Sequence, residues 1–413
     1  MYMCCYFIIL VCLKIDIMKE LVELSEKQVE LVPTRFTREF ISLLKKKDRM
    51  TGITGSRGTG KTTLLLQYMR QSGHRRESLY ISLDDLYFTS YRLLDVADEF
   101  VKTGGRFLFI DEVHHYKNWS IELKLIYDRY PELKVTFTGS SMLHMKQGLA
   151  DLSRRAVIWP LPGLSLREYI NLTEAMDFPV FTLTEILKDH IAASRSIWSR
   201  IKPIQKFREY LQEGYFPYFL ENRETYHIKL KETINKSLES DLPYIIEIDY
   251  AYIDKLRQLL FIISESVPFK PNIQKLSERI GLGKNTLKLY LHYLNQAGLI
   301  MALYKEGKGI SLLTKPEKIY LHHPNLMYCL NPQHTNMGTI RETFFANQLH
   351  FKNTVNYTDR GDFLINRKWI FEIGGKSKSD AQIRNIPEAY LALDDIETGF
   401  KNQIPLWLFG FLY

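Results

Sequence analysis

Cysteine is scarce in this sequence, and its placement excludes two common uses of the residue. Three of the four cysteines, Cys4, Cys5 and Cys12, lie within the first dozen positions, and Cys329 stands alone in the remainder. This spacing fits neither a disulfide framework nor a zinc finger. We therefore expect a reducing, cytoplasmic setting. The sequence also contains no internal repeat and no low-complexity segment.

A long apolar run is lacking as well. Residues 1–13 are apolar, but they are too short to span a bilayer, and neither a preceding basic residue nor a small-residue cleavage site accompanies them. Because Met18 opens a polar helical stretch, residues 1–17 are interpreted as an N-terminal extension read from an upstream start codon. A short membrane anchor is the alternative interpretation. No other membrane partner is expected.

Length and charge suggest the number of domains and the kind of partner. A chain of 413 residues exceeds what one core organises, so two to four domains are expected. The net charge of +8 favours an anionic partner such as ATP, a nucleic acid or an acidic protein. Basic and acidic residues are well mixed along the chain, however, so a solvated surface explains the charge equally well.

Short apolar runs alternate with amphipathic stretches between residues 49 and 160. This alternation predicts an α/β fold, a parallel sheet with flanking helices, preceded by a helical segment over 18–48. Helices are expected after Lys61 and over 119–130, and the stretch 165–250 is interpreted as a helical lid. The predicted strands are 50–54, 79–83, 107–110, 134–138 and 156–159.

A glycine-rich loop separates the first predicted strand from the first helix and matches G-x-x-x-x-G-K-[ST]. Its glycines let successive backbone N–H groups point at phosphates, and the helix N-terminus adds partial positive charge. Lys61 is expected to reach the β- and γ-phosphates of ATP, and the Thr62 hydroxyl to bind Mg²⁺. The predicted nucleotide-binding residues are Gly55, Ser56, Arg57, Gly58, Thr59, Gly60, Lys61, Thr62 and Thr63.

Two carboxylates end the third predicted strand. Asp111 and Glu112 stand at the carboxyl end of the strand, where ligands of open parallel sheets bind. Asp111 is expected to hold the magnesium through water, and Glu112 to act as general base toward the attacking water. Thr138 and Ser140 end the next strand. Their hydroxyls would lie beside Glu112 if that strand lies between the first and third predicted strands. There, Thr138 and Ser140 are candidates to orient the water or to sense the γ-phosphate, although a turn without a role explains them equally well.

Arginine and histidine side chains flank these motifs. Arg154 and Arg155 precede the fifth strand and are candidates to stabilise transition-state charge, from the same chain or from a neighbouring copy in a homo-oligomer. A surface arginine pair is the alternative. His114 and His115 are expected to point in different directions, which argues against a metal role.

The succession of four segments resembles prokaryotic AAA+-type ATPases of uncharacterised role that carry a C-terminal region of unknown function. The segments are 55–63, 107–119, 136–145, and Arg154-Arg155 leading into 161–172. The resemblance extends over nearly the whole chain from residue 20 onward. It implies an ATPase core over 49–164 with an arginine-finger-like position at Arg154 or Arg155. It also implies a C-terminal half with a winged helix and a degenerate restriction-endonuclease-like fold.

The pattern of residues 251–330 is typical of a winged helix, because two short helices flank a glycine turn and a β-ribbon follows. The polar side chains of the second helix are candidates for a DNA groove, although winged helices also bind proteins. These candidates are Lys284, Asn285, Thr286, Lys288, Tyr290 and His292.

Residues 331–413 place Asp362 and Glu372 on two consecutive predicted strands, after a helix that carries Glu342. In a metal-dependent nuclease core, such acids hold Mg²⁺, and a lysine two residues after the glutamate assists the attacking water. Here Lys376 stands two positions too far along and would have to fold back. We therefore expect a nuclease-like α+β domain that serves as a binding platform.

The motifs together predict an ATPase that depends on Mg²⁺ and binds DNA or a protein through its C-terminal half. One alternative is an ATP-gated nuclease that processes DNA. The other is a nucleotide-state switch or interaction scaffold that does not hydrolyse ATP.

Overall fold

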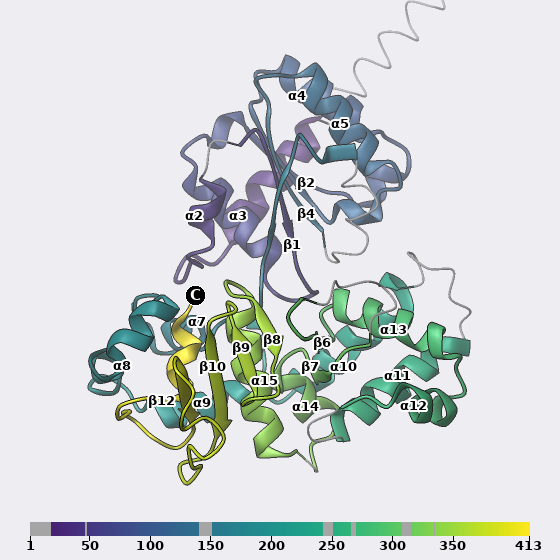
Figure 1. Cartoon of the computed structure of the whole chain (residues 1–413). Helices are drawn as coiled ribbons and strands as arrows, with labels where there is room; N and C mark the ends of the chain where they lie inside the picture. Colours follow the sequence, from purple (N-terminus) through teal and green to yellow (C-terminus); the bar gives the residue numbers. More distant parts are fainter. Residues whose placement is uncertain are drawn as a thin grey trace, which may run out of the picture. The chain divides into compact units, whose positions relative to one another are not determined.

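The structure is a computed structural model, and its chain forms two compact units that divide after Leu161 (Figure 1). It describes residues 18–45, 48–139, 151–242, 251–265, 270–307, 315–333 and 335–413. The predicted extension over residues 1–17 therefore lies outside the described residues. Within these described ranges, no helix is both long and apolar enough to cross a membrane.

The first unit is built on a five-stranded parallel sheet with the strand order β2-β3-β4-β1-β5. Its strands are β1 (Met50–Thr54), β2 (Ser78–Ser82), β3 (Phe107–Asp111), β4 (Lys134–Gly139) and β5 (Val157–Pro160). The predicted α/β fold is confirmed, and each strand lies within one residue of its predicted bounds. The order also places β4 between β1 and β3, as the predicted role of Thr138 requires.

Helices cover both faces of this sheet (Figure 1). The chain first crosses from β1 to the sheet edge at β2 through α3 (Lys61–Gln71), and then returns through α4 (Leu93–Lys102) and α5 (Trp119–Arg129). Because parallel crossovers are right-handed, this reversal puts α3 on one face and the α4–α5 pair on the other. Residues 18–31 and α2 (Ile41–Leu44) add helices ahead of β1. The loops at the carboxyl edge are thereby held on a rigid support.

The second unit combines many helices with two sheets. Its helices are α7 (Leu166–Glu174), α8 (Leu183–Trp198), α9 (Pro203–Glu213), α10 (Tyr226–Lys236), α11 (Ala251–Glu265), α12 (Ile273–Ile280), α13 (Lys284–Gln296), α14 (Pro324–Leu330) and α15 (Met337–His350). Strands β6 (Ile300–Leu303) and β7 (Lys318–Leu321) form an antiparallel pair. The larger sheet has the order β12-β11-β10-β9-β8 and consists of β8 (Val355–Tyr357), β9 (Phe363–Ile365), β10 (Trp369–Gly374), β11 (Ala389–Leu393) and β12 (Gln403–Pro405).

The helices predicted as a lid share one core with the C-terminal sheet. Helices α7 and α9 pack against the 3-10 helix η6 (Leu406–Phe411), and α8 packs against β12. The backbone oxygen of Tyr413 accepts hydrogen bonds from Ser165 Oγ at 2.6 Å and Arg167 Nε at 2.9 Å. These contacts join segments almost 250 residues apart. The winged-helix assignment of 251–330 stays a prediction, although the helices and the β-ribbon occur in the expected order.

Asn325 joins three segments of the second unit through its fully buried side chain. Its Oδ1 accepts hydrogen bonds from Tyr215 N at 2.9 Å and from Tyr226 Oη at 2.6 Å. Its Nδ2 donates to the backbone oxygens of Tyr210 at 3.0 Å and Leu211 at 2.7 Å. Every polar atom of this amide is therefore satisfied by α9, by the loop that follows it, or by α10.

Replacing this amide by an apolar side chain should destabilise the second unit strongly. Asn325→Leu removes one hydrogen bond each from two buried carbonyls, one N–H group and one phenol, although the Tyr210 carbonyl keeps its bond from Gly214 N. We expect a loss of about 3–5 kcal/mol in the free energy of unfolding. Urea denaturation of the full chain measures this loss. Asn336→Ala, which removes an exposed N-cap of α15, is the matched control and should cost only about 1 kcal/mol. Similar losses in both variants would contradict the role given to Asn325.

Candidate functional site

The loop between β1 and α3 has the backbone shape that cradles a phosphate. Gly58 and Gly60 adopt left-handed conformations with φ of 79° and 87°. A Cβ at Gly55 would lie 2.5 Å from the backbone oxygen of Leu161, so no larger residue fits there without a backbone shift. Gly60 is the N-cap of α3 and offers no side-chain cap. The first N–H groups of α3 therefore meet no competing side-chain acceptor from the N-cap, which is the arrangement that binds anions.

Lys61 lies over this loop with its side chain buried. Its Nζ donates hydrogen bonds to the backbone oxygens of Gly55 at 3.0 Å and Ser56 at 3.1 Å. Thr59 Oγ1 also donates to the oxygen of Ser56, at 2.9 Å. The ammonium group is therefore already at the loop that would hold the phosphates. Among the other predicted residues, Arg57 is half-buried and Thr63 is exposed.

Three hydroxyl groups bind the buried Asp111 carboxylate. Its Oδ2 accepts hydrogen bonds from Thr62 Oγ1 at 2.6 Å and Tyr80 Oη at 3.1 Å, and its Oδ1 accepts one from Thr138 Oγ1. These donors come from α3, β2 and β4, on both sides of β3. The contact between Thr62 and Asp111 brings together two oxygen ligands of the kind that Mg²⁺ prefers. The residues predicted to hold the magnesium therefore fit that ion.

Tyr80 is the member of this cluster that the sequence analysis missed. It pairs with Phe109 in the parallel register, and residue 109 shares a face of β3 with Asp111. Burial, followed by the charge of Asp111, raises the pKa of the Tyr80 phenol, which therefore stays a hydrogen-bond donor. The alternation of side chains along β2 could have placed Tyr80 on the same face of the sheet as Asp111. Using this signal required knowledge that β2 lies next to β3.

Glu112 adopts a left-handed conformation with φ of 51°, which is uncommon for a residue with a side chain. Its backbone N–H donates to Thr138 Oγ1 at 3.1 Å, so the Thr138 hydroxyl contacts both Asp111 and Glu112. Burial raises the pKa of its carboxyl group, Lys61 opposes this shift, and Asp111 adds to it. Strain at this position, of about 1–3 kcal/mol, is typical of a functional residue held by its surroundings.

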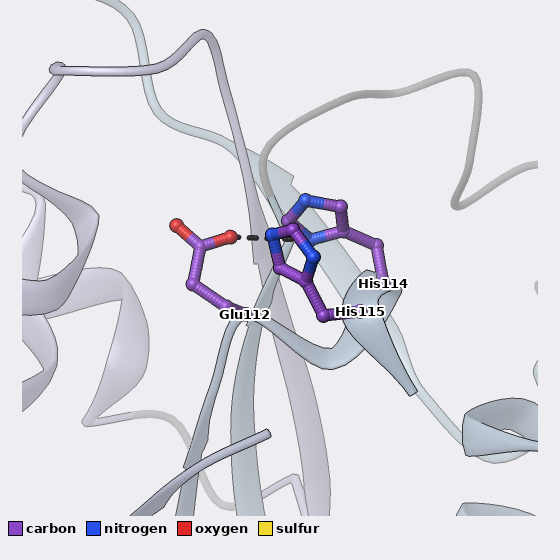
Figure 2. Close-up of side chains that lie close together, drawn as sticks. All are labelled: Glu112, His114 and His115. Atoms are coloured by element: carbon purple, nitrogen blue, oxygen red, sulfur yellow. Dashed lines mark ion pairs between the residues drawn. The ribbon is translucent and has the colours of Figure 1, made fainter. Parts of the chain in front are cut away.

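The two histidines contradict the expectation that they diverge. One ligand atom each of Glu112, His114 and His115 lies within 4.8 Å of the others, and both rings lie on the same side of the carboxylate (Figure 2). The ring centroids are 4.2 Å apart. The reason is the left-handed turn at Glu112 followed by the short 3-10 helix η3 (Val113–His115), which reverses the chain and gathers these side chains.

Of the remaining candidates of the first unit, the structure describes Arg154 and Arg155. Arg155 forms a two-pronged ion pair with Asp128 of α5, at 2.9 and 3.0 Å, and Arg154 is exposed. Ser140 lies outside the described residues. The proposed role of the arginine pair therefore stays a prediction, and Arg154 has the more accessible side chain.

In the second unit, Lys318 joins Glu342 to Asp362, whose charge also acts on Glu372. Lys318 Nζ of β7 lies 3.4 Å from Glu342 Oε2 and 3.3 Å from Asp362 Oδ1. Burial, followed by the charge of Asp362, raises the pKa values of Glu342 and Glu372. The lysine that reaches Glu372 is Lys378, at 2.5 Å.

Lys376, which the spacing suggested as the partner of Glu372, is exposed instead. A turn after Gly374 carries the chain past Lys376 and back toward β10, as the Lys378 N–H bond to the Gly375 oxygen at 3.0 Å shows. A Cβ at Gly374 would lie 2.4 Å from the Lys378 side chain. Glycine at this position therefore leaves room for Lys378 to reach Glu372. The chain therefore does fold back, as an active site would require, but it brings Lys378 to Glu372 and not Lys376.

The class of the first unit follows from this geometry and from comparison with known families. Residues 47–170 match a family model described as an AAA domain, and residues 204–336 match one described as a domain of unknown function (DUF8612). The phosphate loop and the parallel strand order give the first unit a P-loop fold, and residues 47–170 are similar to AAA domains.

An uncharacterised protein of Methanocaldococcus jannaschii is 25% identical over 287 residues. The aligned region covers 66% of this chain and 60% of that protein, so the chain spans about three fifths of its relative's length. Among solved structures, the Walker-type ATPase of Pyrococcus abyssi matches with a TM-score of 0.41 and 14% identity over 73% of this chain and 99% of that chain. AMPPCP-bound DnaA from Aquifex aeolicus matches with a TM-score of 0.24 and 14% identity, over 67% and 88% of the two chains.

The hydroxyl of Thr138 should be needed for both the stability and the nucleotide affinity of the first unit. Thr138→Val keeps the shape but leaves Asp111 and the Glu112 N–H group short of a partner. We expect a loss of about 1–3 kcal/mol in the free energy of unfolding and weaker binding of Mg²⁺·ATP. Denaturant unfolding and titration with a fluorescent ATP analogue measure the two effects. Thr138→Ser keeps the hydroxyl and should keep nucleotide binding; equal behaviour of the two variants would argue against this role.

Proposed function

We propose that the chain hydrolyses ATP with Mg²⁺ in its first unit and couples this reaction to the binding of a macromolecule by its second unit. The observation that supports hydrolysis is the arrangement around Asp111. Its carboxylate joins the Thr62 hydroxyl of the phosphate loop to Thr138, which in turn holds the Glu112 backbone. The metal-binding acid and the base are thereby fixed relative to the loop that receives the phosphates.

Each residue has a defined task in this proposal. Lys61 exchanges its loop carbonyls for the β- and γ-phosphate oxygens, to which it donates hydrogen bonds as a positive charge. Thr62 and Asp111 hold the Mg²⁺ ion, which supplies positive charge beside the phosphates when bound. Glu112 accepts a proton from the water that attacks the γ-phosphate, and its carboxylate has to be ionised to do so.

Two substitutions should separate binding from hydrolysis. Lys61→Ala removes a charge from the phosphates and should weaken ATP binding by about a hundredfold, on the order of 2–3 kcal/mol for a lost charged hydrogen bond. Glu112→Gln removes the base and should lower turnover by about 10²–10⁴-fold while ATP remains bound. Phosphate release and equilibrium binding of an ATP analogue measure the two effects on the purified chain.

Glu132→Gln is the matched control for the glutamate substitution, because this side chain is exposed and meets Arg106 only at 3.9 Å. It should leave both quantities unchanged. Unchanged nucleotide affinity in Lys61→Ala would overturn the nucleotide site itself. Full turnover in Glu112→Gln would instead leave the site intact and remove the base from the mechanism.

The exposed face of α13 supports coupling to DNA. Lys284 and Asn285 are exposed, and Lys288 and His292 follow Lys284 at four-residue intervals with partly exposed side chains. Tyr290, which the sequence pattern had included in this face, is buried and belongs to the core. The coupled function predicts that duplex DNA stimulates the ATPase and that charge reversal at Lys284 and Lys288 abolishes the stimulation. If duplex DNA does not stimulate the ATPase, a protein is the favoured partner.

A second candidate function is metal-dependent cleavage of a phosphodiester by the second unit. The observation that favours it is the ion pair of Lys378 with Glu372. Lys378 provides the positive charge that the position of Lys376 in the sequence did not provide. Glu372 is buried, and its Oε2 has no hydrogen-bond partner among the described residues. An unpartnered buried carboxylate oxygen beside Asp362 fits a divalent ion, which oxygen ligands bind.

Substitutions at the acids test this second candidate. Glu372→Gln and Asp362→Asn should abolish binding of Mn²⁺ to the second unit, measured by electron paramagnetic resonance without nucleotide. Lys378→Gln should tighten Mn²⁺ binding by about threefold or more, because a competing positive charge is removed. Asp359→Asn, which alters an exposed acid paired with Lys305, is the control. Nicking of plasmid DNA by the unmodified chain, lost in Glu372→Gln, would establish cleavage; Mn²⁺ binding without nicking would leave a binding platform.

A further inference from the structure

Three potential metal ligands lie next to one another at the end of β3. The carboxylate of Glu112 and one ring nitrogen each of His114 and His115 lie within 4.8 Å of one another (Figure 2). His114 is buried, Glu112 is partly buried and His115 is exposed, so an ion can reach the cluster from solvent on the His115 side.

Two of these atoms, Glu112 Oε2 and His114 Nδ1, form an ion pair with a separation of 3.1 Å (Figure 2). A tetrahedral Zn²⁺ with bonds of about 2.0–2.1 Å holds its ligand atoms about 3.3 Å from one another. The observed separation therefore matches an edge of such a tetrahedron.

The donor types select the class of ion. Two imidazoles and one carboxylate form a set that suits Zn²⁺ and neighbouring transition metals, whereas Mg²⁺ prefers oxygen ligands alone. The backbone also contributes, because the left-handed conformation of Glu112 and the turn of η3 place the three side chains on one side of the chain. His115, the exposed member, supplies the third protein ligand in this arrangement, and water takes the fourth position.

We propose that Glu112, His114 and His115 form an inhibitory Zn²⁺ site. This inference rests on the proposed function of Glu112 as the general base. An ion bound to its carboxylate occupies the oxygen that accepts the proton from water, so hydrolysis stops. Lys61 and Thr62 are not ligands of this ion, and ATP binding persists. Zinc is therefore expected to lower turnover without weakening nucleotide binding.

Direct binding is measured first, on the full chain without an affinity tag and without nucleotide, with Co²⁺ as the probe. One Co²⁺ per chain should give the visible absorption of four-coordinate cobalt, and Zn²⁺ should displace it. His114→Gln and His115→Gln should each lose this signal. His74→Gln is the matched control, because His74 pairs with Glu77 at 3.4 Å but has no third ligand among the described residues, and it should keep the signal.

Inhibition of ATP turnover is then measured with Mg²⁺·ATP in excess over added Zn²⁺. The rate of each variant with zinc is compared with the rate of the same variant without zinc. The unmodified chain and His74→Gln should lose turnover by about a hundredfold or more, the scale expected when a general base is blocked. His115→Gln should retain most of its own rate, and chelation of zinc should restore the others. ATP affinity, measured in parallel, reports that each variant is folded and should not change with zinc.

The outcomes separate this proposal from the ATPase function. If the unmodified chain turns over no ATP, the proposed function fails, and the Co²⁺ titration still decides whether the metal site exists. If the chain hydrolyses ATP but binds no Co²⁺ in its absence, the zinc site is refuted. Equal inhibition of His115→Gln and the unmodified chain refutes it too, because zinc then acts elsewhere, for example on the nucleotide.

Discussion

The hydrogen bonds to the Asp111 carboxylate are the constraint on which the first unit depends. A buried carboxylate is costly unless it is satisfied, and here three hydroxyls from three other elements satisfy it. The same contacts fix the start of α3 against β2, β3 and β4. Stability and the proposed function therefore depend on the same atoms, because the Asp111 carboxylate, which suits a metal ion, also joins the sheet to the phosphate loop.

The first unit could be predicted closely from the sequence because its signals are local. The glycine loop, the apolar strand before Asp111 and the alternation of strands with helices each depend on a few adjacent residues. The position of β4 between β1 and β3 was a condition in the sequence analysis, and the observed strand order meets it. Thr138 was found under that condition, whereas Tyr80 was missed because no motif pointed to β2 as the other neighbour of β3.

The errors have a common physical origin in backbone turns that a linear pattern does not reveal. A regular strand end would send His114 and His115 to opposite sides, but the left-handed Glu112 and the 3-10 turn bring them together. The tight turn after Gly374 similarly puts Lys378, and not Lys376, on Glu372. The helices called a lid were correct as helices, but their packing against β12 and η6 depends on contacts between residues far apart in the chain.

Lys318 connects two parts of the second unit through ion pairs. It belongs to the antiparallel pair β6–β7, yet its buried ammonium group lies between a carboxylate on α15 and one that precedes β9. A ligand that pulls this ribbon away would take a positive charge out of the acid cluster and leave its carboxylates more repulsive to one another. Mechanical displacement of the ribbon would thus be converted into a change in cation affinity, without any direct contact between the ligand and the acids.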